Sequence, residues 1–134
     1  MQLTPSDIKS LHAAPEMIAA DISSHYTIEE IARYVLLSPT KLKKGFKQLF
    51  KMNPFEYLET QRMERAKTLL SHTDKPLKQI SRLSGFQYFN NFSRAFKRNS
   101  GVSPHEWRKS VKSILMITAH LSLFPFETIT SLIA

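Results

Sequence analysis

A pattern that occurs twice restricts this chain to a helical fold. The first copy has an Ile-Ala-Arg segment at residues 31–33, followed by a turn and a lysine-rich stretch. The second copy has Ile-Ser-Arg at residues 80–82, followed by a similar gap and a stretch that contains Arg94, Lys97 and Arg98. In both copies a short amphipathic segment is joined to a second one whose polar face is basic. This order predicts two helix-turn-helix units.

Proline and capping residues divide the chain into about seven predicted helices. At Thr4-Pro5, Ser38-Pro39, Asn53-Pro54 and Ser103-Pro104, a capping side chain directly precedes a proline at the first helical position. The predicted helices span residues 5–23, 27–35, 38–50, 53–71, 76–84, 87–99 and 103–112. Pro15 lies inside the first of them and predicts either a kink or a fresh start there. Because the chain has 3 Gly and lacks the alternation typical of strands, a sheet protein is disfavoured.

The predicted architecture is all-α, with two helix-turn-helix subdomains joined by a long central helix. The first unit covers about residues 27–50, the central helix 53–71 and the second unit 76–99, within one domain over residues 1–112. The apolar face of the central helix is expected to hold the two halves together, and it consists of Phe55, Leu58, Met63, Ala66, Leu69 and Leu70. Residues 113–134 form an apolar C-terminal extension, interpreted as an added packing helix, a dimer contact or an unnatural tail.

Charge is distributed unevenly along the chain. The formal net charge is +8, but residues 1–37 carry a net charge of −3 and the remainder carries +11. A positive surface attracts polyanions such as nucleic acid. On charge alone, a surface that merely keeps the protein in solution is an equal alternative. The position of the charges on the predicted helices therefore carries more information than their number.

Catalysis, metal binding and membrane insertion find little support in the sequence. There is no Cys, which excludes a disulfide framework and a thiolate metal site. The 5 His are scattered, and no nucleophile triad, nucleotide-binding loop or metal-ligand spacing occurs, so we expect neither an enzyme nor a cofactor. The N-terminus lacks the features of a signal peptide. His120, Pro125 and Glu127 make the apolar extension a poor membrane span, so the protein is expected in the cytoplasm.

The second helix of the first unit has a polar face rich in lysine. No acidic residue occurs between Lys41 and Lys51. In helix-turn-helix proteins, the first turns of this helix meet base edges in the major groove, while later and flanking residues meet phosphates. The candidates for base contact are Thr40, Lys43 and Lys44, and those for phosphate contact are Lys41, Lys47 and Lys51. The alternative is a solvated lysine face without a partner.

The second helix of the second unit is richer in side chains that distinguish bases. Asn pairs bidentately with adenine, and Arg pairs in the same way with guanine. The candidates for base contact are Phe89, Asn90, Asn91 and Arg94, and those for phosphate contact are Gln87 and Lys97. Phe89 either meets a thymine methyl group or packs in the core as an aromatic at helical spacing. Asn90 is alternatively the N-cap of the helix.

The second unit also carries a family resemblance. Residues 85–108 begin with Gly-Phe, continue through Phe-Ser-Arg-Ala-Phe and end with Gly-Val-Ser-Pro-His-Glu-Trp-Arg. This run resembles the signature of the AraC/XylS transcriptional regulators. Residues 42–47, 57–58 and 62–70 are similar to the upstream part of that signature, so the resemblance covers about residues 5–110. It implies seven helices, with two recognition helices that enter successive major-groove segments on one face of double-stranded DNA.

The same resemblance implies further phosphate contacts, and the chain departs from the family pattern at two positions. It implies the base-contacting positions already named and backbone contacts at helix N-termini, here at Thr27, Pro104 and His105. Leu36 stands where the first turn of the family usually has Gly, and Lys51 stands where a helix-ending Gly is usual. Both turns of the first unit are therefore expected to be strained or differently shaped.

The sequence as a whole predicts sequence-specific binding of double-stranded DNA and regulation of transcription, by a monomer that reads an asymmetric site. The alternative is a helical protein-interaction module that contacts RNA polymerase or another regulator. Family members usually carry an effector-binding or dimerisation domain ahead of this one, and none is present in this chain, which is interpreted as a fragment or a stand-alone regulator. The expected location is the bacterial cytoplasm, in association with the nucleoid.

Overall fold

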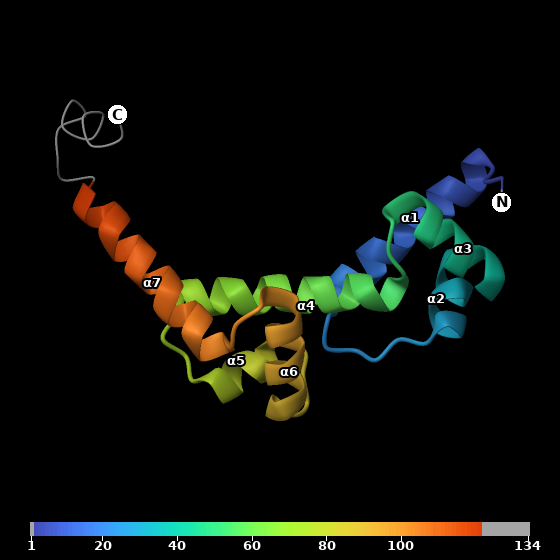
Figure 1. Cartoon of the computed structure of the whole chain (residues 1–134). Coiled ribbons are helices and arrows are strands. Elements are labelled where there is room, and N and C mark those ends of the chain that lie inside the picture. Colours follow the sequence, from blue (N-terminus) through green and yellow to red (C-terminus); the bar gives the residue numbers. More distant parts are fainter. Residues whose placement is uncertain (1, 122–134) are drawn as a thin grey trace.

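The computed structural model describes residues 2–121, and this part of the chain forms seven α-helices without a strand (Figure 1). The helices are α1 (Pro5–Ala20), α2 (Ile28–Val35), α3 (Pro39–Phe50), α4 (Pro54–His72), α5 (Leu77–Leu83), α6 (Phe89–Ser100) and α7 (Pro104–Leu121). The predicted all-α fold is confirmed. None of the helices in residues 2–121 is both long and apolar enough to cross a membrane.

Side-chain caps explain why several helices begin where the sequence predicts. The hydroxyl oxygens of Thr4 and Ser38 accept hydrogen bonds from the backbone N–H of Asp7 and Lys41, both at 3.1 Å. Asn53 caps α4 in the same way. Each cap satisfies an N–H group that has no partner within its own helix, and each precedes a proline that needs none.

The first helix is continuous across Pro15, so the fresh start expected there as one alternative is wrong. Leu11, Ala14 and Ile18 lie on one face of α1 and are fully buried against residues of α2, α3 and the start of α4. A proline inside a helix costs about 3 kcal/mol. Burial of two large aliphatic side chains, at about 1.5–3 kcal/mol each, offsets that cost.

The helices gather in two groups, one at each end of α4 (Figure 1), and in the described part of the chain each group has its own hydrophobic core. The first core is built from α1, α2, α3 and the start of α4, where Leu58 is buried. The second is built from the rest of α4 with α5, α6 and Trp107 of α7. We call these parts the first lobe and the second lobe, and α4 belongs to both. The predicted role of α4 as connector is confirmed, except that Phe55, expected on its apolar face, is 48% exposed.

The last helix is longer than the sequence suggested. It was expected to end near residue 112 but continues to Leu121. Ile114, Met116 and Ile117 are exposed, so this part of α7 does not pack on either lobe. The interpretation of the extension as a packing helix therefore fails for these residues, and its remaining part lies outside the described residues.

Both turns of the first helix-turn-helix unit keep the usual backbone shape without glycine. Leu36, at the end of α2, has φ 62° and ψ 41°, and Lys51, at the end of α3, has φ 62° and ψ 19°. The left-handed region is strained for residues with a Cβ atom. The expectation of strain is thus supported at both positions, while Gly85 and Gly101 serve the corresponding positions of the second unit.

Candidate nucleic-acid interface

The first predicted recognition helix, α3, buries one face and exposes the other. Leu42, Gly45 and Phe46 face the first core, and the opposite face is exposed to solvent. That exposed face carries four of the predicted contact residues, namely Thr40, Lys43, Lys44 and Lys47. The side chains of the three lysines form no hydrogen bond or ion pair with any described residue. Their charges are therefore available to an external anion.

Two further lysines of this unit have internal partners. The Nζ atom of Lys41 lies 3.1 and 3.2 Å from the two carboxylate oxygens of Asp7, and the Lys41 side chain is only 38% exposed. The backbone N–H of Thr4, and then Lys41 itself, stabilise the Asp7 carboxylate and lower its pKa. The Nζ atom of Lys51 donates to the carbonyl oxygen of Gln48 at 2.9 Å. These contacts make Lys41 and Lys51 weaker candidates for a phosphate contact than Lys47.

Gly45 sets how closely α3 approaches α1, a role that the sequence analysis missed. A Cβ atom at this position would lie 2.7 Å from Cδ1 of Leu11 and 3.3 Å from a methyl group of Leu3. The signal in the sequence is a glycine in the middle of a helix, where it is unfavourable unless another segment approaches closely.

The second predicted recognition helix, α6, has the same division into a buried and an exposed face. Phe92, Ala95 and Phe96 are buried in the second core. The predicted contact residues on its other face, Asn90, Asn91, Arg94 and Lys97, are all exposed. The guanidinium of Arg94 donates to Oδ1 of Asn91 at 2.8 Å. This bond orients both side chains on the exposed surface before any ligand arrives.

The sequence left two roles open at the start of α6, for Phe89 a base contact or a core position, and for Asn90 a base contact or the N-cap. Phe89 is half-buried and packs against Phe92, with 6.1 Å between the ring centroids, so it belongs at least in part to the core. Asn90 is not the N-cap, because Tyr88 occupies that position and no side chain caps the helix. The uncapped start leaves N–H groups and the positive end of the helix dipole open to an anion.

The remaining phosphate candidates lie at turns and helix starts. Gln87 and His105 are exposed. Thr27 uses its hydroxyl oxygen to cap α2, accepting from the N–H of Glu30 at 3.1 Å. Pro104 is fully buried and, as a proline, has no N–H group to donate, so it is a weaker candidate for a phosphate contact than the exposed His105.

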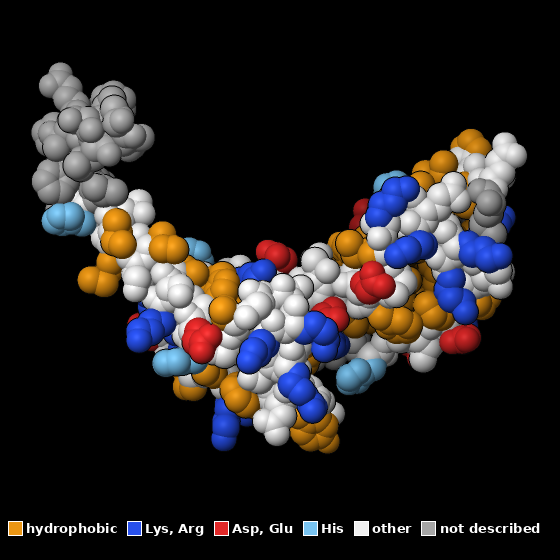
Figure 2. Space-filling model, in the orientation of Figure 1, with side chains coloured by type: hydrophobic (Ala, Val, Ile, Leu, Met, Phe, Trp, Pro, Cys, Tyr) orange, Lys and Arg blue, Asp and Glu red, His pale blue; other side chains and the backbone are white. Residues whose placement is uncertain are grey.

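Basic side chains gather at both ends of one face of the molecule. Figure 2 shows Lys and Arg side chains over α3 and again over α6 and the start of α7, with acidic side chains over α4 between them. No group of three or more His, Asp or Glu side chains in residues 2–121 is arranged to hold a metal ion. The surface thus offers two positive regions separated by a helix.

Comparison with known proteins agrees with this geometry. A family model described as a helix-turn-helix domain matches residues 31–110. The arabinose operon regulatory protein of Salmonella typhimurium is 40% identical over 85 residues, which are 63% of this chain and 30% of that regulator. The chain therefore corresponds to less than a third of that relative's length.

Solved structures show the same arrangement of helices. A transcriptional regulator from Chromobacterium violaceum with an AraC-type DNA-binding domain has 29% identity and a TM-score of 0.71, over 81% of this chain and 96% of that one. The C-terminal domain of AraT, a response regulator from Geobacillus stearothermophilus, has 29% identity and a TM-score of 0.67, over 82% and 88%. With the family model matching more than half of its residues, this chain belongs to the AraC/XylS family of helix-turn-helix transcriptional regulators.

Proposed function

We propose that this chain binds duplex DNA through α3 and α6 together and thereby regulates transcription. The observation that carries the proposal is the pair of exposed polar faces, each fixed by its own buried core and both attached to the continuous helix α4. Two helices held in this way can enter two neighbouring segments of the major groove on one face of DNA. The partner is double-stranded DNA in the cytoplasm, at the bacterial nucleoid.

The two recognition helices have different tasks in this proposal. The hydrogen-bonded pair of Asn91 and Arg94 reads bases, because amide and guanidinium groups form bidentate bonds with base edges. Lys43 and Lys44 of α3, with Thr40, make the base contacts of the first unit, while Lys47 and Lys97 neutralise phosphates. Sequence preference is therefore expected to come mainly from α6, and affinity for any duplex from both helices.

The DNA-binding domain covers residues 1–112 in this proposal, and residues 113–134 form an apolar C-terminal extension to which the proposal assigns no role. The alternative of a module that only binds proteins is not favoured, because the related proteins are transcriptional regulators with AraC-type DNA-binding domains. RNA polymerase remains a candidate partner of the DNA-bound protein.

Selection from a pool of random duplexes tests the proposal. We expect two short motifs about 10 bp apart, one helical turn of DNA, bound by one protein molecule. Enrichment of a single short motif, or of no motif, would contradict bipartite reading. Binding should also weaken steeply as the salt concentration rises, because phosphate contacts release counterions.

Two substitutions separate base reading from phosphate binding on the selected duplex. Arg94→Ala should cost about 1–3 kcal/mol and relax the preference at one base position. Lys47→Ala should weaken binding to all duplexes about equally and reduce the slope of log K against log salt by about 1. Equal weakening on every duplex by Arg94→Ala would make Arg94 a phosphate contact only, and an unchanged salt slope would remove Lys47 from the interface.

A further inference from the structure

The two lobes are joined by a second contact besides α4. Every pair of helices with extensive contact belongs to one lobe, when α4 is counted in both. One contact that crosses this separation is made by the loop between α1 and α2, residues 21–27, which reaches α4 and the turn that precedes α6. We infer that this loop, which accepts hydrogen bonds from Arg62 and packs against Gly85, fixes the distance and orientation between α3 and α6. It thereby determines which spacing between two DNA half-sites the protein accepts. The inference rests on the proposed function.

Arg62 is the residue that holds the loop. Its Nε atom donates to the carbonyl oxygen of Ile22 at 2.7 Å, and one terminal nitrogen donates to the carbonyl oxygen of Ser24 at 3.2 Å. The guanidinium carbon also lies 5.3 Å from the centre of the Phe86 ring, within range of a cation–π contact. One side chain of α4 thus touches the loop of the first lobe and the turn of the second.

Gly85 lets the second lobe approach the same loop. It has φ +94°, and a Cβ atom there would lie 2.5 Å from the carbonyl oxygen of Ile22 and 2.8 Å from Nε of Arg62. The carbonyl cannot move aside freely, since it accepts the hydrogen bond from Arg62. Gly85 is therefore required by its backbone conformation and by the closeness of the loop.

The loop is itself fixed, so that holding it also holds the first lobe. The hydroxyl of Tyr26 donates to the carbonyl oxygen of Asp21 at 2.6 Å, and the carboxylate of Asp21 accepts from Ser23 and Ser24. Ile22 and Tyr26 both pack against the first core. Because the loop is held to the first core in this way, a movement of Arg62 is expected to move the whole first lobe and not the loop alone.

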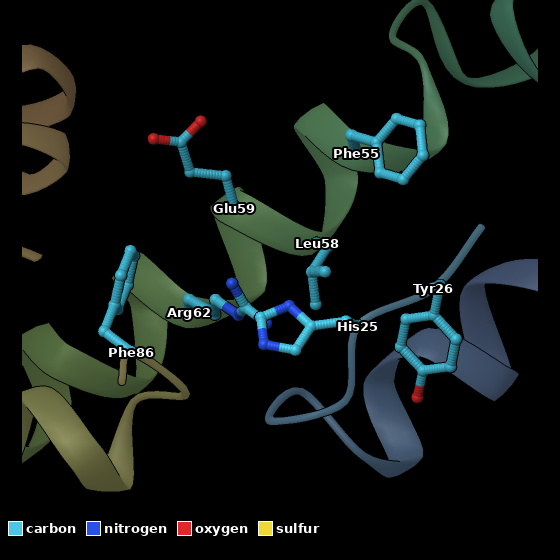
Figure 3. Close-up of a pocket in the computed structure, with 7 residues that line it drawn as sticks. All are labelled: His25, Tyr26, Phe55, Leu58, Glu59, Arg62 and Phe86. Atoms are coloured by element: carbon cyan, nitrogen blue, oxygen red, sulfur yellow. The ribbon is translucent and has the colours of Figure 1, made fainter. Parts of the chain in front are cut away.

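An open pocket lies beside the contact between the lobes. Arg62 and Phe86 line an open pocket of about 270 Å³ together with residues of the loop and of α4 (Figure 3). In this view Arg62 lies between Phe86 and His25, beside the open space. Both lobes pack on α4 and Arg98 of α6 pairs with Glu59 of α4, and the hydrogen bonds of Arg62 and the fit of Gly85 add a direct link between the lobes that resists rotation of one against the other.

Rotation of the lobes matters because DNA half-sites are rigidly spaced. Adding one base pair moves the second half-site by about 3.4 Å and rotates it by about 35° around the DNA axis. A protein with fixed lobes cannot follow such a change, whereas one with loose lobes can. Arg62 and Gly85 are in this sense positioning residues: they contact no DNA but decide where α6 meets it.

The first experiment measures spacing selectivity. The duplex with the selected spacing is compared with duplexes one base pair longer or shorter, and with an isolated half-site. The unmodified protein should lose about tenfold or more in affinity when the spacing changes, because contacts of one recognition helix are lost. Arg62→Gln and Gly85→Ala should reduce this ratio to about twofold while leaving the affinity for the isolated half-site unchanged.

The matched control is Gly101→Ala. Gly101 has φ +83°, similar to Gly85, but a Cβ atom there would have no neighbour within 4 Å. This variant carries the same kind of backbone strain without disturbing the loop and should keep the full spacing selectivity. Unchanged selectivity in Arg62→Gln and Gly85→Ala, or an equal loss in the control, would overturn the inference.

A second measurement needs no DNA and separates failure of the inference from failure of the proposed function. Because the chain has no Cys, single cysteines at the exposed positions Gln48 of α3 and Asn99 of α6 can carry spin labels. The distance distribution should be narrow in the otherwise unmodified protein and clearly broader with Arg62→Gln. Equal widths would refute the role of Arg62 whether or not the protein binds a bipartite site.

Discussion

Replacing Leu36 by glycine should stabilise this protein. Leu36 ends α2 in the left-handed backbone region, with φ 62° and ψ 41°. Its side chain is 87% exposed, so almost no buried apolar surface would be lost with it. The strain of the left-handed region, in contrast, acts through the Cβ atom and would disappear.

The magnitude follows from two opposing effects. A residue with a Cβ atom in the left-handed region costs about 1–2 kcal/mol. Glycine gives back about 0.4–1 kcal/mol of this gain, because the unfolded chain has more freedom with glycine. The midpoints of these two ranges leave a net increase in the free energy of unfolding of about 0.8 kcal/mol, which raises Tm by about 2–5 °C for a chain of this length.

Thermal unfolding followed by far-UV circular dichroism, with the urea midpoint as an independent measure, tests this expectation. Leu36→Ala is the control, because it removes the exposed side chain but keeps the Cβ atom. It should not raise Tm as Leu36→Gly does. If both variants gained equally, or if Leu36→Gly melted at or below the temperature of the unmodified protein, backbone strain at Leu36 would be refuted as the cause.

Two other substitutions test the contacts between α3 and α1. Gly45→Ala should lower the free energy of unfolding by up to about 2 kcal/mol, because its methyl group would meet Cδ1 of the fully buried Leu11 at 2.7 Å and the better helix propensity of Ala, about 1 kcal/mol, offsets only part of that cost. A neutral result in equilibrium urea unfolding would contradict this expectation. Asp7→Asn should destabilise the protein at neutral pH, because the carboxylate accepts from Thr4 and pairs with Lys41. Folding lowers the pKa of Asp7, so the contribution of its carboxylate is fully present above the ordinary value of 3.8 and is lost as the pH falls through the lower folded pKa. Urea midpoints measured from neutral to acid pH should thus converge for the two proteins, and a constant difference would contradict the assignment.

Residues next to one another in the chain largely determine the helix starts. A capping side chain followed by proline acts within four residues, and this signal predicted the starts of α1, α3 and α4 to within one position. The end of α7 had no such signal, because no glycine or proline interrupts the chain between residues 105 and 121. The exposed faces of α3 and α6 were also predictable, since apolar spacing shows which side of a helix faces a core.

Side chains with several available partners were harder to assign. The lysines of α3 look equivalent in the sequence, yet Lys41 pairs with Asp7, which is 34 residues away. Phe89 and Asn90 are neighbours at the start of α6, and only packing against Phe92 decides which of them turns toward the core. These outcomes depend on contacts between distant residues, about which local patterns carry no information.

The amino-acid sequence alone determined the helical class, the two repeated units, the helix that joins them and the basic faces, because all of these depend on periodicity, caps and charge along a single segment. The tertiary structure decided how the two lobes are held relative to one another. The hydrogen bonds from Arg62 to the loop after α1 and the close approach of Gly85 to Ile22 join residues far apart in the chain, and only folding brings them together.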